Sequence, residues 1–273
     1  MKKKICLPLS VLNEAEALDK FLKFHSWADE IIVFDSGSTD RTEEVCKRYA
    51  CRIVKCSLNG NYNQRAAFIL TQTKADWILF IAPDEFVTPE LKSEIDKVLE
   101  NDNEPYQAYE NRRINYFMDK PLMHGGWGGY DLKFMKREAA SFIGDSYHEK
   151  PIINGKIGRL EGTLLHYPNP NIHWVLQKFN FISEFDSKEY YSNFGELPEK
   201  KFKRLLLTKP LKNFWKGYIK KKGYKDGLHG FIYAVLIWAF DVIRICKYGE
   251  KYIIKNPNIL SIDKLPDPWD CRK

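Results

Sequence analysis

The sequence lacks any C-x-x-C pair among its six cysteines. Zinc ribbons and thioredoxin-like redox sites need such pairs, and Cys51 and Cys56 have no second pair at metal-ligand spacing. The spacing therefore excludes both classes, and we expect reduced thiols that are largely buried.

A secretory signal and low-complexity tracts are missing too. The apolar stretch behind residues 1–4 is broken by Asn13, Glu14 and Glu16, whereas a signal needs about 7 to 15 uninterrupted apolar residues. Hydrophobic residues make up 44% of the chain and aromatic residues 14%, which is too rich for a disordered protein. We expect a folded protein that stays in the cytoplasm.

Acidic residues are absent from residues 200–225, which carry eleven Lys or Arg, although the net charge of the whole chain is only +7. Aromatic and aliphatic residues are interleaved with these cations. Such a segment suits the anionic surface of a membrane or the phosphates of a glycolipid; nucleic acid is a weaker alternative because no nucleic-acid-binding motif accompanies it. A solvated basic face without function is the remaining interpretation.

An apolar helix is predicted at residues 228–246, interrupted by Asp241 and Arg244. Its uncharged part is shorter than the ~20 residues that span a bilayer. We expect residues 200–246 to lie on the inner membrane surface without crossing it.

Strand and helix patterns alternate four times in the first hundred residues. Apolar runs at residues 5–12, 30–34, 52–56 and 77–81 read as buried strands, and helical spacing follows at 15–24, 39–49 and 63–73. This order predicts an α/β fold with a mostly parallel sheet, whose ligands bind beyond the carboxyl ends of the strands. Polar, carboxylate-bearing turns follow three of these strands, at Asn13-Glu14, Asp35-Ser36 and Asp84-Glu85.

Six segments in this order resemble the family 2 inverting glycosyltransferases of GT-A fold: PLSVLNEAEAL, ADEIIVFDSGSTDRT, NQRAAFILTQTKADWILFIAPDEFVTPEL, HGGWGGYDLKFMKR, YHEKP and GTLLHY. The resemblance covers the whole chain and is closest to the bacterial branch that adds β-linked glucose to the lipopolysaccharide inner core. It implies a Rossmann-like mixed central sheet with helices on both faces and a C-terminal helical, membrane-associating extension. We expect domains at residues 1–195 and 196–273, the first comprising a nucleotide-binding part (about 1–105) and an acceptor part (about 106–195).

The resemblance also implies site residues. Those around the UDP-sugar are Ser10, Asn13, Glu14, Asp35, Ser36, Arg65 and Asp84. The alternative for Asp35 is a turn or helix-capping residue, a role that Ser38 or Asp40 could fill equally well; we favour nucleotide binding for Asp35 and capping for Asp40.

Asp84 matches the second, metal-binding acid of the family's Asp-x-Asp signature, but Ala82 stands where the first acid is expected. With His148 and the diphosphate, Asp84 is expected to hold Mg²⁺ or Mn²⁺. The alternative is that Asp84 and Glu85 only begin the helix predicted at Thr88.

Inversion needs a base within hydrogen-bond reach of the acceptor hydroxyl. Glu149 is the first candidate and Asp131 the second. Trp127 is expected to stack on the acceptor sugar, with a core Trp beside a bend as the alternative. His166 is a further possible partner of the metal or diphosphate, although a lone His is more often structural.

We predict an inverting hexosyltransferase that moves glucose from a UDP-sugar to a lipid-linked saccharide in lipopolysaccharide or surface-glycan synthesis. Ala82 motivates a second hypothesis, a catalytically impaired protein that binds sugar nucleotides or glycans. A nucleotidyltransferase ranks last, because the N-terminal region has no Gly-rich phosphate loop.

Overall fold

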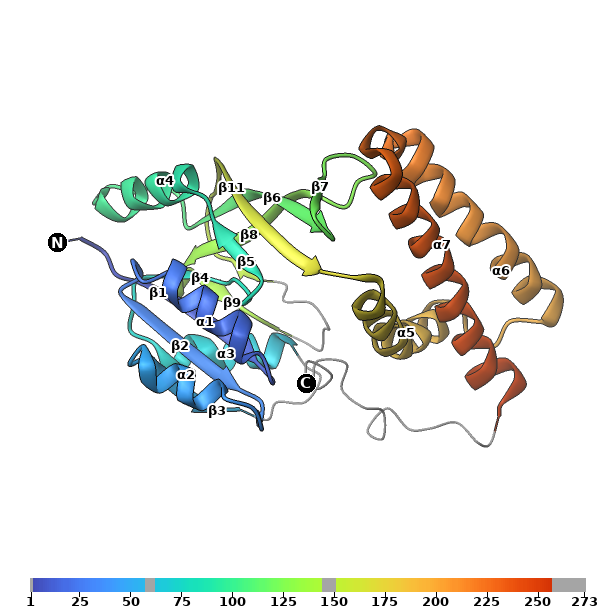
Figure 1. Ribbon diagram of the computed structural model, residues 1–273, viewed down its shortest axis with the longest axis horizontal. Coiled ribbons are helices and arrows are strands. Elements are labelled where there is room, and N and C mark those ends of the chain that lie inside the picture. The colour runs from blue at the N-terminus through green and yellow to red at the C-terminus, as the bar shows by residue number, and fades with distance from the viewer. Residues whose placement is uncertain (1, 57–61, 144–150, 257–273) are drawn as a thin grey trace. The chain divides into compact units, whose positions relative to one another are not determined.

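The computed structural model describes residues 2–56, 62–143 and 151–256, and Figure 1 shows the arrangement of its elements. The N-terminal part alternates strands and helices in the predicted order. Its elements are β1 (Ile5–Val11), α1 (Ala15–Phe24), β2 (Glu30–Asp35), α2 (Thr42–Arg48), β3 (Arg52–Lys55), α3 (Tyr62–Gln72), β4 (Trp77–Leu79), β5 (Glu85–Val87) and α4 (Pro89–Glu100).

Longer strands follow, and then helices. These elements are β6 (Ala108–Phe117), β7 (Lys120–Leu122), β8 (Gly129–Lys136), η1 (Arg137–Ala139), β9 (Ala140–Ser141), β10 (Ile152–Ile153), β11 (Ile157–Asn169), α5 (Ile172–Phe194), α6 (Glu199–Phe214), η2 (Trp215–Lys220), η3 (Gly223–Asp226), α7 (Gly227–Gly249) and η4 (Glu250–Ile254).

One mixed sheet joins strands from both parts of the chain. Its order is β3-β2-β1-β4-β8-β6-β11-β5, with β7 paired to β6. The first four strands are parallel, whereas β8 runs antiparallel to both β4 and β6. A separate two-stranded sheet holds β9 and β10.

Helices cover both faces of the parallel strands. Successive side chains of a strand point to opposite faces of the sheet, so each strand contributes to the core on either side. Leu7 and Leu9 of β1 pack into a core with residues of α1, α2 and α4, whereas Cys6 between them belongs to a second core. Ile69 of α3 lies in that second core. The predicted fold class, α/β with a mixed sheet, helices on both faces and C-terminal helices, is confirmed.

The chain divides into two compact units. Unit 1 contains the described residues of Met1–Ile114 and Gly129–His166, and unit 2 contains Asn115–Gly128 and the described residues from Tyr167 onward. In unit 2, α5 is capped by Asn171, whose Oδ1 accepts the Trp174 N–H at 2.8 Å, and ends at Gly195, with φ of 61°. The boundary near residue 195 remains a prediction about domains.

The C-terminal helical run is longer than the sequence pattern predicts. Residues Gly223–Ile254 form a helical stretch of 32 residues that, by length and composition alone, is long and apolar enough to cross a membrane. The expectation that this segment is too short to do so counted only its uncharged part. Length therefore does not decide between crossing a membrane and lying on it.

Candidate functional site

The turns after β1 and β2 are tied together by two polar side chains. Asn13 adopts a left-handed backbone, with φ of 54°, and its Oδ1 accepts the Thr39 N–H at 2.8 Å. Asp40 accepts the N–H of Ala15 at 3.0 Å and that of Thr42 at 3.0 Å, so it caps the start of both α1 and α2. The capping interpretation of Asp40 is confirmed.

Asp35 ends β2 with its side chain only 1% exposed. Its carboxylate accepts the Ser38 N–H at 2.9 Å and lies 2.5 Å from Lys55 Nζ on the neighbouring strand. Burial alone would raise the pKa of Asp35, but the bonds from Lys55 and Ser38 outweigh it and hold that pKa below its ordinary value. Asp35 is therefore a buried, ionised acceptor at the carboxyl end of a parallel strand.

The other residues predicted around the nucleoside lie nearby in the topology. Ser10 is half-buried near the end of β1 and pairs in register with Phe34, and the Ser36 N–H donates to Val11 O at 3.0 Å. Glu14 is buried just before α1, and Arg65 is half-buried on α3. Their contacts with a nucleotide remain predictions.

The turn after β4 presents Asp84. Glu85 N–H donates to Ala82 O at 2.9 Å, and the Ala82 N–H donates back to Glu85 Oε2 at 2.9 Å, so two hydrogen bonds close residues 82–85. Strand β5 then separates Asp84 from α4, which is capped by Thr88 Oγ1. The alternative that Asp84 and Glu85 begin that helix is wrong.

Glu85 is the centre of a buried charge cluster. Its side chain is 1% exposed and lies 3.1 Å from Lys133 Nζ and 3.5 Å from Arg113 Nη1. Burial opposes ionisation, but Lys133, His166 and Arg113 together keep the pKa of Glu85 below its ordinary value. Glu85 is thus occupied by cations and is a poor candidate for a metal ligand.

Asp131, the second candidate base, belongs to the same cluster. Its Oδ2 lies 2.8 Å from Arg113 Nη1, so Arg113 is placed between two carboxylates from different strands. The Asp131 side chain is 34% exposed, so an acceptor can reach it while Oδ2 stays paired with Arg113. The ion pair also allows Asp131 to orient Arg113, and its role as a base stays a prediction.

His166 on β11 faces the Asp84 turn. Its Nε2 lies 3.8 Å from Asp84 Oδ1, and His166 pairs in register with Glu85. Burial lowers the pKa of His166 more than Asp84 and Glu85 raise it, so the imidazole is neutral at pH 7. A neutral imidazole can donate a lone pair to a metal ion.

A divalent ion fits this corner only in part. Among the described residues, no group of three or more His, Cys, Asp or Glu side chains could hold a metal. Asp84 and His166 are close enough to share one ion, because two ligand bonds of about 2.1 Å span about 4 Å. Diphosphate oxygens and water would have to supply the other ligands.

Two predicted residues, His148 and Glu149, lie outside the described residues. The metal role of His148 and the base role of Glu149 therefore stay predictions.

Trp127, predicted to bind the acceptor, lies in unit 2. Its indole stacks on Tyr233 of α7, with ring centroids 4.5 Å apart and planes at 18°, and its carbonyl accepts Asn115 Nδ2 at 2.6 Å. One face of the ring is therefore used within the protein. A sugar could stack only on the other face of the ring. The stacking on Tyr233 favours the alternative that Trp127 is a core residue beside a bend, and its contact with an acceptor stays a prediction.

Sequence reasoning missed Lys55, Arg113 and Lys133. The role of each depends on which carboxylate lies beside it in three dimensions, as Lys55 at the end of β3 lies in register with Asp35. Lys133 belongs to the segment HGGWGGYDLKFMKR, but nothing in that segment connects it to Glu85.

Comparison with known proteins identifies the family. Residues 9–143, which include every described strand-end carboxylate discussed above, match the profile described as Glycosyl transferase family 2. The chain carries a family 2 glycosyltransferase domain. The enzyme class predicted from the sequence, a glycosyltransferase, is thereby confirmed, and the GT-A class predicted with it agrees with the observed α/β topology.

Relatives of this glycosyltransferase extend over most of its length. An uncharacterized glycosyltransferase of Rickettsia bellii is 26% identical over 96% of this chain and 92% of its own. The lipopolysaccharide core biosynthesis glycosyltransferase LpsC of Rhizobium meliloti is 25% identical over 93% of this chain and 96% of its own.

Among solved structures, the glycosyltransferase is similar to glucosyl-3-phosphoglycerate synthase from Mycobacterium tuberculosis, in complex with Mn²⁺, UDP and phosphoglyceric acid. The identity is 17%, with a TM-score of 0.40, covering 60% of this chain and 70% of that chain.

Proposed function

We propose that this glycosyltransferase moves a hexose, in the first instance glucose, from a UDP-sugar to a lipid-linked saccharide with inversion at the anomeric carbon. The acceptor belongs to lipopolysaccharide or another surface glycan, and the reaction takes place at the cytoplasmic face of the inner membrane. The observation that carries the proposal is the position of two carboxylates in a family 2 domain: Asp35 is the last residue of the parallel strand β2, and Asp84 lies in the turn after the parallel strand β4. The similarity to LpsC supports a lipopolysaccharide acceptor.

In the proposed donor site, Asp35 accepts a hydrogen bond from uracil or ribose, with Ser10, Asn13, Glu14, Ser36 and Arg65 around the nucleoside. Lys55 keeps Asp35 ionised and therefore a pure acceptor.

Asp84, with His166 or His148, would hold Mg²⁺ or Mn²⁺ against the diphosphate. The bound ion would supply positive charge for the leaving group. The 3.8 Å separation between Asp84 and His166 favours His166 among the described residues.

For the transfer itself, Glu149 takes the proton from the acceptor hydroxyl. The acceptor oxygen then bonds to the anomeric carbon while UDP departs with the electrons of the broken bond. Asp131 is the second candidate for this base, and its Oδ2 is paired with Arg113.

The direct test is release of UDP from UDP-glucose by the purified full chain, with detergent-dispersed core saccharides as acceptors and Mn²⁺ present. We expect turnover that falls at least ~100-fold in Glu149→Gln and Asp84→Asn. Absence of UDP release from every common sugar nucleotide would contradict the proposal.

The second candidate function is that of a catalytically impaired protein that binds sugar nucleotides, and it is motivated by Ala82 in place of the first acid of Asp-x-Asp. If calorimetry detects UDP-sugar binding while turnover stays absent, the chain is a sugar-nucleotide-binding protein of this family. Restoring the acid with Ala82→Asp would then be expected to bring back turnover in Mn²⁺.

A further inference from the structure

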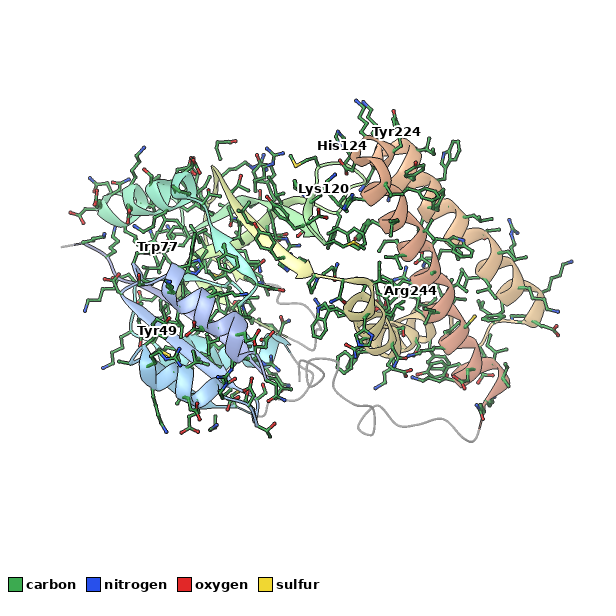
Figure 2. The ribbon with its side chains drawn as sticks, viewed as in Figure 1. Tyr49, Trp77, Lys120, His124, Tyr224 and Arg244 are labelled. Carbon is green, nitrogen blue, oxygen red and sulfur yellow. The ribbon has the colours of Figure 1, made fainter. Side chains whose placement is uncertain are left out.

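The helices of unit 2 bury several charged residues beside their apolar core, and they leave a set of large apolar residues exposed. Asp241 of α7 is 1% exposed, accepts Asn213 Nδ2 of α6 at 2.8 Å and pairs with Arg244. Arg244 in turn lies 3.2 Å from Asp186 of α5, and Figure 2 labels its side chain among the helices. The charges that interrupt the apolar helix therefore link the three helices to one another.

A second interior pairing repeats this arrangement. Glu184 of α5, 7% exposed, is held by Lys247, 2.6 Å away, and by Lys251. The charged side chains of α7 are thus paired toward the other helices, and the residues on its outer face are a separate set.

That outer face is apolar along two helices. On α6 and η2 the exposed apolar residues recur at intervals of four, and on α7 at intervals of three and four, so each set forms one stripe. The stripes consist of Leu207 (67% exposed), Leu211 (61%), Trp215 (56%) and Ile219 (37%), and of Leu228 (68%), Phe231 (44%), Val235 (38%) and Trp238 (38%).

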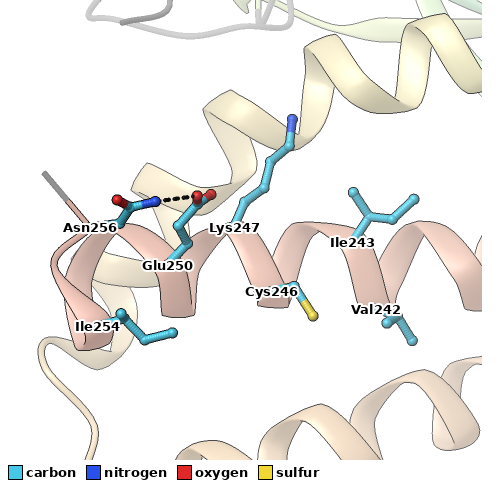
Figure 3. Close-up of a pocket in the computed structure, with 7 residues that line it drawn as sticks. All are labelled: Val242, Ile243, Cys246, Lys247, Glu250, Ile254 and Asn256. Carbon is cyan, nitrogen blue, oxygen red and sulfur yellow. Dashed lines mark hydrogen bonds between the residues drawn. The ribbon is translucent and has the colours of Figure 1, made fainter. Parts of the chain in front are cut away.

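The two stripes meet at Tyr218. Its ring lies 5.6 Å from that of Phe231 on α7 and 5.4 Å from that of Phe214 at the end of α6. Toward the end of α7 lies a shallow groove, drawn in Figure 3, whose lining is mixed: Val242, Ile243, Cys246 and Ile254 with Lys247, Glu250 and Asn256. We call the two stripes, without this groove, the apolar face.

Basic residues flank the apolar face along α6. Lys203, Lys212 and Lys216 are all exposed, and on a helical projection Lys203 falls on one side of the Leu207–Trp215 stripe and Lys212 and Lys216 fall on the other. Exposed apolar area of this extent is unusual on a soluble surface, and a border of cations favours an anionic partner.

We propose that the apolar face inserts shallowly into an anionic bilayer, with α6 and α7 lying in the plane of the membrane and the flanking lysines among the lipid headgroups. This deepens the proposed function, because it names the lipid surface that the enzyme binds and the residues that bind it.

Shallow insertion rather than crossing follows from α6. A crossing α7 would take its packed neighbour α6 into the hydrocarbon together with exposed Lys212 and Lys216, each costing several kcal/mol there. When α6 lies in the membrane plane, the lysine side chains can extend to water while the leucines of the apolar face are buried among the lipid chains.

The test is flotation of the purified full chain with vesicles of 70% phosphatidylethanolamine and 30% phosphatidylglycerol, compared with vesicles of phosphatidylcholine alone. We expect the wild type to float with the anionic vesicles and Leu207→Asp/Leu211→Asp to lose at least tenfold in affinity. Lys212→Ala and Lys216→Ala should each cost about fivefold, only on anionic vesicles.

Matched controls separate insertion from general damage. Ile143→Asp changes a 71% exposed apolar residue of unit 1 and should float like the wild type. Circular dichroism of each variant should match the wild type. Because the chain has seven Trp, the Trp215 signal is the difference in fluorescence between the wild type and Trp215→Phe; this signal should be quenched by bromine placed near the headgroups and not by bromine at the bilayer centre.

Three results would overturn the proposal. These are a wild type that does not float, a Leu207→Asp/Leu211→Asp variant that floats normally, and deep quenching of Trp215. A dimer that Leu211→Asp dissociates, without vesicle binding, would assign the face to a second copy instead. Failure of the proposed reaction would appear separately, as vesicle binding without UDP release.

Discussion

His166 Nε2 lies 3.8 Å from Asp84 Oδ1, although the two residues are 82 positions apart in the sequence. The antiparallel pairing of β5 with β11 produces this proximity, because it sets His166 opposite Glu85, the residue after Asp84. The acid of the incomplete Asp-x-Asp motif thereby gains an imidazole neighbour that the linear motif does not contain.

His166→Gln should weaken activation by Mn²⁺. If His166 shares the ion with Asp84, the Mn²⁺ concentration for half-maximal UDP release should rise by ~10- to 100-fold, with little change in thermal stability. The measurement is a Mn²⁺ titration at fixed UDP-glucose. Asp96→Asn, a partly exposed carboxylate paired with Lys92, serves as the control, and an unchanged titration for His166→Gln would leave His148 as the remaining histidine candidate.

Asp35→Asn should destabilise the protein in a pH-dependent manner. The folded-state pKa of Asp35 lies below its ordinary value of 3.8, so the carboxylate stabilises the fold fully above that value and loses its effect as pH falls through the folded pKa. We expect a loss of about 1–2 kcal/mol at pH 7 and a smaller loss at about pH 3. Urea denaturation at both pH values tests this, with exposed Asp102→Asn as a neutral comparison; an equal loss at both pH values would contradict it.

Glu85→Gln should be strongly destabilising at pH 7. The substitution removes the counter-charge of Lys133 and Arg113 at a position that is 1% exposed. We expect about 3 kcal/mol, the lower end of the range for breaking a buried ion pair, since both cations keep some contact with water. Chemical denaturation measures it, and a change below ~1 kcal/mol would show that the cluster contributes little to the fold.

Gly162→Ala should destabilise unit 1 through a steric clash. A Cβ atom at residue 162 would lie 2.3 Å from Leu91 Cα and 2.5 Å from Leu91 N, both backbone atoms of α4. Overpacking of this kind costs about 1–3 kcal/mol because the helix backbone cannot move aside cheaply. At Gly129 a Cβ would meet nothing within 4 Å, so Gly129→Ala should melt like the wild type; equal melting temperatures for the two variants would refute the clash.

The parallel half of the fold was predictable because each strand and helix carries its own local pattern. Strand β2 contains the β-branched run Ile31–Val33 followed by Phe34, and α1 buries Leu18, Phe21 and Leu22 on one face at helical spacing. Strand β4 ends at Leu79 and is therefore shorter than predicted, although the Phe80 N–H still donates to Lys133 O at 2.9 Å.

The site was predictable only where residues follow strand ends. Asp35 and Asp84 could be named from topology, whereas Arg113 and Lys133 could not, because their partner Glu85 lies on another strand and no local pattern connects them. The same limit applies to α7. Its interrupting charges were visible in the sequence, but only packing against α5 and α6 reveals that Asp241 and Arg244 point inward.

Within unit 2, His124 links the glycine-rich loop before β8 to Asp226 at the end of η3. The backbone N–H of His124 donates to Asp226 Oδ2 at 2.9 Å, and its Nδ1 lies 2.8 Å from Asp226 Oδ1. Gly125 N–H donates to Lys221 O at 2.9 Å beside it. A shortened chain ending at residue 195 would therefore strip residues 123–128 of their supports, and with them the stacking partner of Trp127. The C-terminal helices therefore support the loop at residues 123–128, and deleting them would destabilise a segment about a hundred positions earlier in the sequence.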